Sequence, residues 1–227
     1  MGPLERYRTP HDLPARLAIF PLPGALLLPR TRLPLNIFEP RYLAMVRDAM
    51  AAEQIIGMVQ PVLAGLEPLA VIEERPPVRG VGCAGRITSY TETDDGRLLI
   101  VLTGIARFRV TAEIEGPGPY REVEADFAPF ADDLTAGFGE AAVDRRVLIE
   151  TLRSYLDARQ LVADWGEIEA ASTESLVNSL SVLSPYPADD KQALLEATDL
   201  KARAEMLIAL TEMALARAEG AAVSRLQ

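Results

Sequence analysis

The sequence contains very few of the residues on which most catalytic and metal chemistry depends. Its 227 residues include one cysteine (Cys83), one histidine (His11) and two lysines (Lys191 and Lys201). A single cysteine excludes an internal disulfide and is typical of the reducing cytosol, so we expect a cytoplasmic protein. One cysteine and one histidine cannot supply the three or four ligands of a zinc site, so no metal or other cofactor is predicted.

The same two residues offer no activated nucleophile. A cysteine–histidine pair needs a base that a scaffold holds within hydrogen-bond reach. His11 lies in a polar leader that we expect to be mobile, as chain termini usually are. Cys83 stands in a strand-like run, where a free cysteine is most often a small buried hydrophobe. The sequence therefore predicts no catalytic residue.

Acidic residues outnumber basic ones, and long apolar runs are scarce. The net charge is −10 and the isoelectric point is about 4.7, which opposes non-specific binding to nucleic-acid phosphates. The first apolar run, residues 17–28, is interrupted by Pro21, Pro23 and Gly24. It is too short and too interrupted to span a bilayer, so no membrane association is predicted.

Composition divides the chain into four regions. The regions are a flexible leader (1–15), a mostly β domain (16–127), a linker rich in proline, glycine and acidic residues (128–139) and a helical bundle (140–220). Within the β domain, Asp95-Gly96 separates two strand-like runs and predicts a tight hairpin, because type I′ turns need positive φ angles.

The most specific pattern lies near the start of the β domain. Ile19-Phe20-Pro21-Leu22-Pro23-Gly24 is followed by Leu33-Pro34-Leu35-Asn36-Ile37-Phe38-Glu39-Pro40-Arg41-Tyr42. We expect two short apolar strands joined by a turn rich in proline and glycine, and then a third strand that leads into a helix. The helix should begin at Pro40, where a missing N–H has no consequence. Leu43, Val46 and Met50 would form one apolar face of that helix.

This arrangement resembles the start of the substrate-binding, N-terminal domain of Lon proteases, and the FEPRY form is similar to its stand-alone bacterial members. Three later segments match the family in order: 81–87 with the 95–96 hairpin, 102–108, and the helical segments 176–183, 190–196 and 200–203. The resemblance covers roughly residues 16–217. It implies an α+β fold, with a PUA-like β pseudo-barrel that carries one helix and is followed by a C-terminal helical bundle.

Two features of a complete Lon protease are missing from the sequence. Neither lysine follows a glycine, so the phosphate-binding loop G-x-x-x-x-G-K-[ST] does not occur. The chain ends after the helical bundle, so a peptidase domain with a lysine-activated serine is not expected. Residues 80–85 fit G-x-G-x-x-G, but they run into a β hairpin and not into a helix, so a dinucleotide site is rejected.

We therefore expect a non-catalytic module that binds proteins or peptides, as an adaptor or recogniser in protein quality control. The resemblance implies an unfolded polypeptide or protein client, and possible association with a protease subunit. Leu35, Phe38 and Tyr42 would line a concave apolar surface near the junction of barrel and bundle. The alternative is that Phe38 and Tyr42 only fix the corner between strand and helix.

Two further expectations concern charged residues. Glu39 should form a structural ion pair with Arg107 or Arg86. PUA-like barrels often bind RNA, so a nucleic-acid-related module is the alternative function. A face that gathers Arg79, Arg86, Arg107 and Arg109 would favour it.

Overall fold

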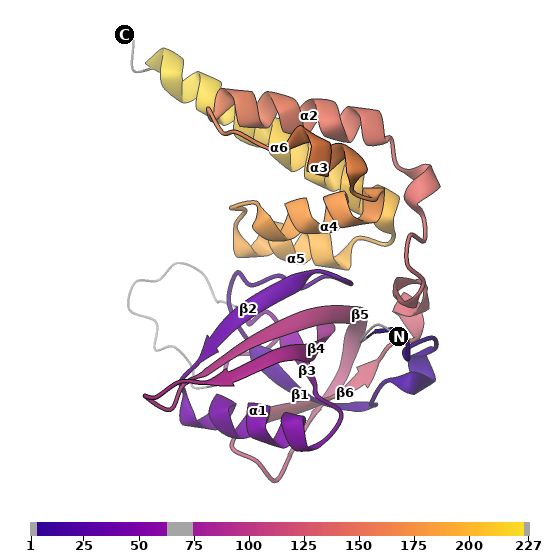
Figure 1. Ribbon diagram of the computed structural model, residues 1–227, viewed down its shortest axis with the longest axis vertical. Helices are drawn as coiled ribbons and strands as arrows, with labels where there is room; N and C mark the ends of the chain where they lie inside the picture. The colour runs from indigo at the N-terminus through magenta and orange to yellow at the C-terminus, as the bar shows by residue number, and fades with distance from the viewer. Residues whose placement is uncertain (1–3, 63–74, 225–227) are drawn as a thin grey trace. The chain divides into compact units, whose positions relative to one another are not determined.

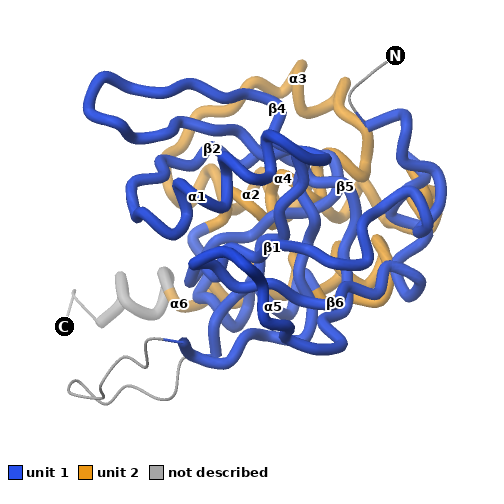
Figure 2. The backbone as a smooth tube through the Cα atoms, turned by 90° about the horizontal axis from the view of Figure 1, so that it is seen from below, with its two compact units in different colours: residues 1–136, 185–195 blue, residues 137–184, 196–227 orange. Residues whose placement is uncertain are grey.

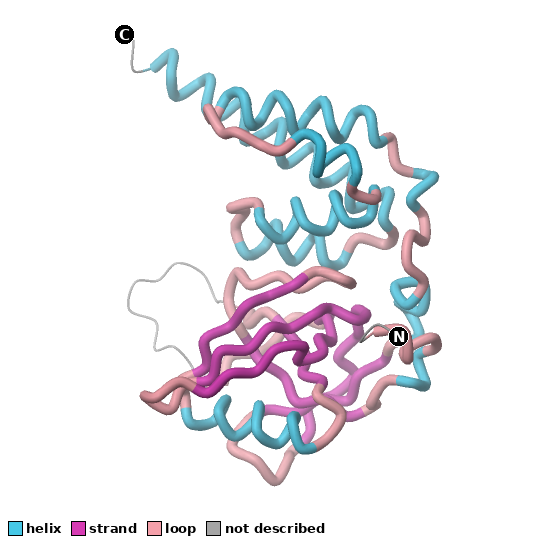
Figure 3. Tube along the Cα trace, in the orientation of Figure 1, coloured by secondary structure: helices cyan, strands magenta, loops and turns pink. Residues whose placement is uncertain are grey.

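The computed structural model describes residues 4–62 and 75–224, which form two compact units (Figure 2). Unit 1 comprises Met1–Ala136 and Pro185–Leu195, and unit 2 comprises Gly137–Ser184 and Glu196–Gln227. Unit 1 holds all the described strands and unit 2 is helical, which gives the mixed α+β composition visible in Figure 3. The predicted fold class, a β pseudo-barrel with a helical part, is confirmed.

Unit 1 is built on a six-stranded sheet (Figure 1). Its elements are η1 (Pro10–Asp12), β1 (Arg16–Pro21), β2 (Arg32–Ile37), α1 (Pro40–Ala51), β3 (Ile55–Val59), β4 (Val81–Glu92), β5 (Leu98–Ile114), β6 (Arg121–Asp126), η2 (Ala128–Leu134) and α5 (Ala188–Glu196). The strand order is β2-β5-β4-β3-β1-β6, and β5 also pairs with β6.

The length of β5 explains how the sheet closes on itself. One edge of β5 pairs with β4 from Leu98 to Arg109. The other edge pairs with β2 from Leu98 to Thr103 and with β6 from Arg109 to Ile114. Strands β5, β4, β3, β1 and β6 therefore form a closed ring, and β2 extends it at one side. The β1–β3 pairing is parallel and the other described strand pairings are antiparallel.

Close backbone approach inside the barrel explains two of its glycines. A Cβ atom at Gly104 would lie 2.0 Å from the carbonyl oxygen of Leu28, and one at Gly82 would lie 2.6 Å from that of Met58. At Gly104 the approach is held by hydrogen bonds, because Arg30 N donates to its carbonyl at 2.8 Å. No residue with a side chain fits these positions unless the neighbouring backbone moves.

Helix α1 begins at Pro40 as predicted and packs against β1 and β3 (Figure 1). Its buried face consists of Tyr42, Met45, Val46 and Ala49, spaced i, i+3, i+4, i+7. The predicted face of Leu43, Val46 and Met50 is therefore rotated by about one residue. This rotation matters for the site, because it places Tyr42 in the core.

The expectation of a flexible leader is corrected for residues 4–15. Tyr7 and Leu13 are buried in the same apolar cluster as Phe108 of β5. The hydroxyl of Tyr7 also accepts a hydrogen bond from Arg86 at 3.1 Å. The segment has no periodic pattern of apolar residues that would predict its burial. Contacts with residues distant in sequence hold it against the barrel.

Helix α5 lies in the region that the sequence assigns to the helical bundle, but all of it except Glu196 groups with unit 1. Its carbonyl groups accept hydrogen bonds from Gln60 (to Ala188, 3.0 Å) and Arg107 (to Leu195, 3.1 Å). Its Gln192 donates to the carbonyl of Val81 at 3.1 Å. The boundary at residues 136 and 137 lies inside the predicted linker 128–139, while the division into separate domains stays a prediction.

Unit 2 consists of helices joined by short connections. They are η3 (Glu140–Ala142), α2 (Arg145–Ala158), α3 (Trp165–Ala170), α4 (Thr173–Leu183) and α6 (Leu200–Ser224). Asp144, Asp164 and Ser172 cap α2, α3 and α4, each accepting a backbone hydrogen bond at 3.1 Å. No helix in the described part of the chain has the length and apolar character that crossing a membrane requires.

Candidate functional site

An apolar patch lies on the outer face of β2 and β5 in unit 1. Along β5, Leu98, Ile100 and Leu102 are buried, so the alternating residues Leu99 and Val101 face outward. Pro34 and Phe38 lie on the same face, because Pro34 pairs with Val101 and the register continues from Ile37–Leu98 to Phe38. We call Pro34, Phe38, Leu99 and Val101 the Phe38 patch.

Two members of the Phe38 patch are strongly exposed. The side chain of Phe38 is 61% exposed and that of Leu99 is 45% exposed. Diagonal neighbours across an antiparallel pair lie close enough for an aromatic ring to reach the other side chain. The exposed Asn36 lies directly opposite Leu99 on the same face, so one polar side chain stands among the apolar ones. Exposed apolar side chains gathered on one face of a folded protein often mark a binding site.

Two arginines border this patch, because Arg97 lies beside Phe38 and the exposed Arg32 precedes Pro34 by two residues on the same face of β2. The guanidinium of Arg97 lies 5.9 Å from the centre of the Phe38 ring, within cation–π range. Its Nε pairs with Asp95 Oδ2 at 2.9 Å. A hydrogen bond from Thr93, helped by Arg97, lowers the pKa of the Asp95 carboxyl. The carboxylate therefore stays ionised beside Arg97, and this ion pair adds little net charge to the border of the patch.

The structure does not bring Leu35, Phe38 and Tyr42 together on one face. Tyr42 is only 7% exposed, and its ring centre lies 4.3 Å from that of Phe20. Burial also raises the pKa of the Tyr42 hydroxyl. Leu35 is half-buried on the face of β2 opposite Phe38. The predicted peptide contact is therefore corrected for Tyr42, which fixes the corner between β2 and α1, and it stays a prediction for Phe38.

The predicted ion pair between Glu39 and Arg107 is wrong. Glu39, the residue before α1, pairs with Arg41 at 2.8 Å on the surface. Arg107 lies in β5 and pairs instead with Asp133 of η2. The cause is topological, since β5 is covered at this point by η2 and not by the start of α1.

The Arg107–Asp133 pair was missed because residues 128–139 were interpreted as a linker. Arg107 Nε and Nη2 donate to Asp133 at 2.8 and 2.9 Å, and the backbone N–H of Arg107 donates to the same carboxylate at 2.9 Å. Both side chains are buried, and the guanidinium lies 4.5 Å from the ring of Phe130. This network holds η2 against the barrel.

The arginines that would have favoured nucleic-acid binding do not form one basic face. Arg107 is buried with Asp133, and Arg79 pairs with Asp189 of α5. Arg86 donates to Tyr7 Oη and, at 2.8 Å, to Gln54 Oε1. The charge or the donors of these three arginines are thus used within unit 1, while the fourth, Arg109, is exposed on β5.

The remaining candidates from the sequence lie apart from the patch. Cys83 is fully buried in β4, and His11 is exposed in η1. Residues 80–85 lead into and along β4, which agrees with the rejection of a dinucleotide fingerprint. In residues 4–62 and 75–224, no three histidine, cysteine or acidic side chains are grouped in a way that could hold a metal ion.

Comparisons of the chain with known proteins agree on one family. Residues 16–212 match the family model of the ATP-dependent protease La (LON) substrate-binding domain. Lon protease 2 of Myxococcus xanthus is 28% identical over 210 residues, which are 88% of this chain and 24% of that protein. Lon protease of Salinispora arenicola is 30% identical over 207 residues, which are 90% of this chain and 24% of the relative.

The chain therefore spans about a quarter of the length of the curated relatives it matches. Two solved structures share the fold. The N-terminal domain of Mycobacterium avium complex Lon protease superposes with a TM-score of 0.62 at 20% identity, covering 87% of this chain and 98% of that one. A Lon N-terminal domain protein from Xanthomonas campestris gives 0.57 at 24% identity, covering 86% and 97%. The chain belongs to the LON substrate-binding domain family.

Proposed function

We propose that this chain is a non-catalytic module that recognises apolar segments of unfolded polypeptides through the Phe38 patch. The observation that carries the proposal is the exposure of Phe38, 61% of whose side chain is open to solvent while its neighbour Ile37 is buried. Aromatic anchors of this kind dominate the binding energy of many protein interfaces. Family membership supports the proposal, because the matching family is a substrate-binding domain.

Side-chain contact is a better explanation of binding here than addition of a strand. Among the described strands, β2 pairs with β5 alone, so its second edge is the natural place for an extended peptide. However, Pro34 lies in the middle of β2 and has no N–H to donate, which weakens any added ladder. We therefore assign the affinity to Phe38 and Leu99 and expect little sequence specificity.

The cellular role follows from the same proposal. A module that holds apolar segments could serve as an adaptor or recogniser in protein quality control, with a protease subunit as a partner in the cytoplasm. Capture of a protease subunit by the tagged chain would support this role. A nucleic-acid-related function has no comparable support, because Arg79, Arg86 and Arg107 are engaged within unit 1.

The test compares two exposed phenylalanines. Phe38→Ser removes the central ring of the patch, and Phe138→Ser removes a ring that is 53% exposed in unit 2. Binding of a fluorescent, unstructured apolar peptide is measured by anisotropy. We expect Phe38→Ser to raise Kd by about 30-fold, as for an interface hot spot, with little change in Tm.

Phe138→Ser should leave Kd unchanged. Equal Kd values for the native chain and Phe38→Ser would contradict the proposed surface. An equal loss in both variants would show that the peptide responds to exposed rings in general and not to this patch.

A further inference from the structure

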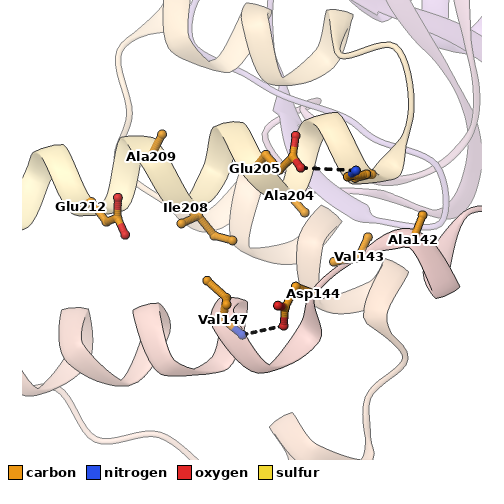
Figure 4. A pocket seen from close by; sticks show the side chains of 10 residues that line it. Ala142, Val143, Asp144, Val147, Ala204, Glu205, Ile208, Ala209 and Glu212 are labelled. Atoms are coloured by element: carbon orange, nitrogen blue, oxygen red, sulfur yellow. Dashed lines mark hydrogen bonds and ion pairs between the residues drawn. The ribbon is translucent and has the colours of Figure 1, made fainter.

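Unit 2 contains a groove that the proposed function does not use. It has a volume of about 530 Å³ and lies between the start of α2 and the exposed side of α6 (Figure 4). Its apolar lining comes from Ala142, Val143, Val147, Ala204, Ile208 and Ala209. We call it the α2–α6 groove. Its volume lies in the range of sites that bind ligands.

The rim of the α2–α6 groove is acidic. It carries three carboxylates, Asp144, Glu205 and Glu212, and one ammonium group, Lys201. Lys201 lies 3.8 Å from Glu205, which is a loose, exposed pair. Asp144 uses one oxygen to cap α2, by accepting from Val147 N at 3.1 Å. Glu212 has no ion pair among the residues that the structure describes. An excess of negative charge thus borders an apolar floor.

The walls of the groove restrict the conformation of an occupant. Along α6 the backbone groups are hydrogen-bonded within the helix, so this wall offers no ladder to an extended peptide. An occupant must therefore satisfy its own backbone, and a helix does so. Glu205 and Glu212 are separated by seven residues on α6, which is about two helical turns, or roughly 10 Å. Basic residues spaced i and i+7 on a docked helix would face both carboxylates.

We propose that the α2–α6 groove docks an amphipathic helix of a partner protein, with an apolar face against Val147 and Ile208 and Lys or Arg residues against Glu205 and Glu212. Charge complementarity selects this occupant, because the partner supplies the cations that the rim lacks. The site is distinct from the Phe38 patch, which takes unstructured apolar segments in unit 1. One chain would then hold an unfolded segment and a folded partner at different surfaces.

Synthetic peptides added to the full chain carrying Phe38→Ser test the occupant, because this variant lacks the ring proposed to bind unstructured apolar peptides. The first peptide carries leucines with helical spacing and lysines one heptad apart. In the second peptide glutamate replaces each lysine, and in the third a central proline prevents the helix. We expect the first peptide to bind in anisotropy measurements, with affinity that falls as salt increases. The second and third should bind at least about tenfold more weakly, since each loses one of the two features that the groove selects.

Variants locate the binding site. Ala209 is an exposed residue of the groove lining, so Ala209→Arg adds bulk and a cation without disturbing the core. Ala158→Arg makes the same change at an exposed alanine outside the lining. We expect Ala209→Arg to weaken binding about tenfold or more and Ala158→Arg to leave it unchanged. Glu212→Gln should weaken binding a few-fold and reduce its salt dependence, while Glu169→Gln, an exposed acid on α3, should not.

Several results would overturn the proposal. They are failure of the lysine peptide to bind, equal binding of the glutamate or proline peptide, and equal loss in Ala209→Arg and Ala158→Arg. Self-association of the chain that Ala209→Arg abolishes, in the absence of peptide binding, would assign the groove to a second copy instead. Loss of peptide binding in Phe38→Ser, with Ala209→Arg unaffected, would move the site to unit 1.

Discussion

Removing Asp133 should destabilise unit 1 strongly, although this residue lies in a segment whose composition is typical of a linker. Asp133→Ala deletes the acceptor of three hydrogen bonds, from the backbone N–H, Nε and Nη2 of Arg107. Arg107 is only 4% exposed, so its guanidinium would be left buried without its counter-charge. Breaking a buried pair in this way costs about 3–5 kcal/mol of unfolding free energy.

Cys83 provides the assay, because it is fully buried in β4 and reacts with a thiol reagent only when the barrel opens. A loss of 3–5 kcal/mol predicts a reaction rate about 100-fold to several thousand-fold higher under native conditions. Urea denaturation followed by circular dichroism gives an independent measure.

A double variant distinguishes the cost of the uncompensated charge from the cost of lost side-chain packing. Replacing both partners with apolar residues, Arg107→Met with Asp133→Leu, should recover much of the stability lost in Asp133→Ala, because no buried charge is left uncompensated. A change below about 1 kcal/mol in Asp133→Ala would refute the idea that the pair holds η2. A double variant as unstable as Asp133→Ala would refute the explanation by uncompensated charge.

Two further predictions follow from buried tyrosines. Tyr42→Ala should lower the unfolding free energy by about 3–5 kcal/mol in urea denaturation, as for other buried aromatics, while Tyr42→Phe has a small effect. Tyr120 donates to Asp48 at 2.8 Å, and burial together with this hydrogen bond raises the pKa of its hydroxyl from 10.0 to about 12. The folded state therefore holds this proton more tightly, so stability should fall between about pH 10 and pH 12 and be constant just below that range. Tyr120→Phe should flatten this decline in alkaline urea denaturation, and an unchanged decline would contradict the assignment.

Local patterns in the sequence were sufficient for elements that are determined locally. The start of α1 at Pro40 follows from the fixed φ angle of proline, and the β4–β5 hairpin turns at Asp95-Gly96. The expected type I′ turn is wrong, because of these two residues only Gly96, at 78°, has a positive φ angle. The family motifs also made it possible to predict the pseudo-barrel and the helical part. These features depend on residues close to one another in the sequence.

Elements held by distant contacts could not be predicted in the same way. Tyr7 and Leu13 are buried against strands that are distant in sequence, and Asp133 is ordered by Arg107 of β5. The burial of Tyr42, in contrast, could have been predicted from the sequence. The spacing of Tyr42, Met45, Val46 and Ala49 is a better helical stripe than the one proposed, and it places Tyr42 in the core. Exposure of Phe38 then follows from the alternation along β2.

The interruption of unit 1 by residues 137–184 has a consequence for synthesis on the ribosome. Residues 185–195 complete unit 1, but they are translated only after η3 and α2–α4 of unit 2. At 5–20 residues per second this is a delay of roughly 2–10 s. During that time Gln60 and Arg107 lack their acceptors on Ala188 and Leu195. Unit 1 therefore cannot form its contacts with α5 until residues 185–195 have been synthesised, so the two units cannot be completed one after the other from the N-terminus to the C-terminus.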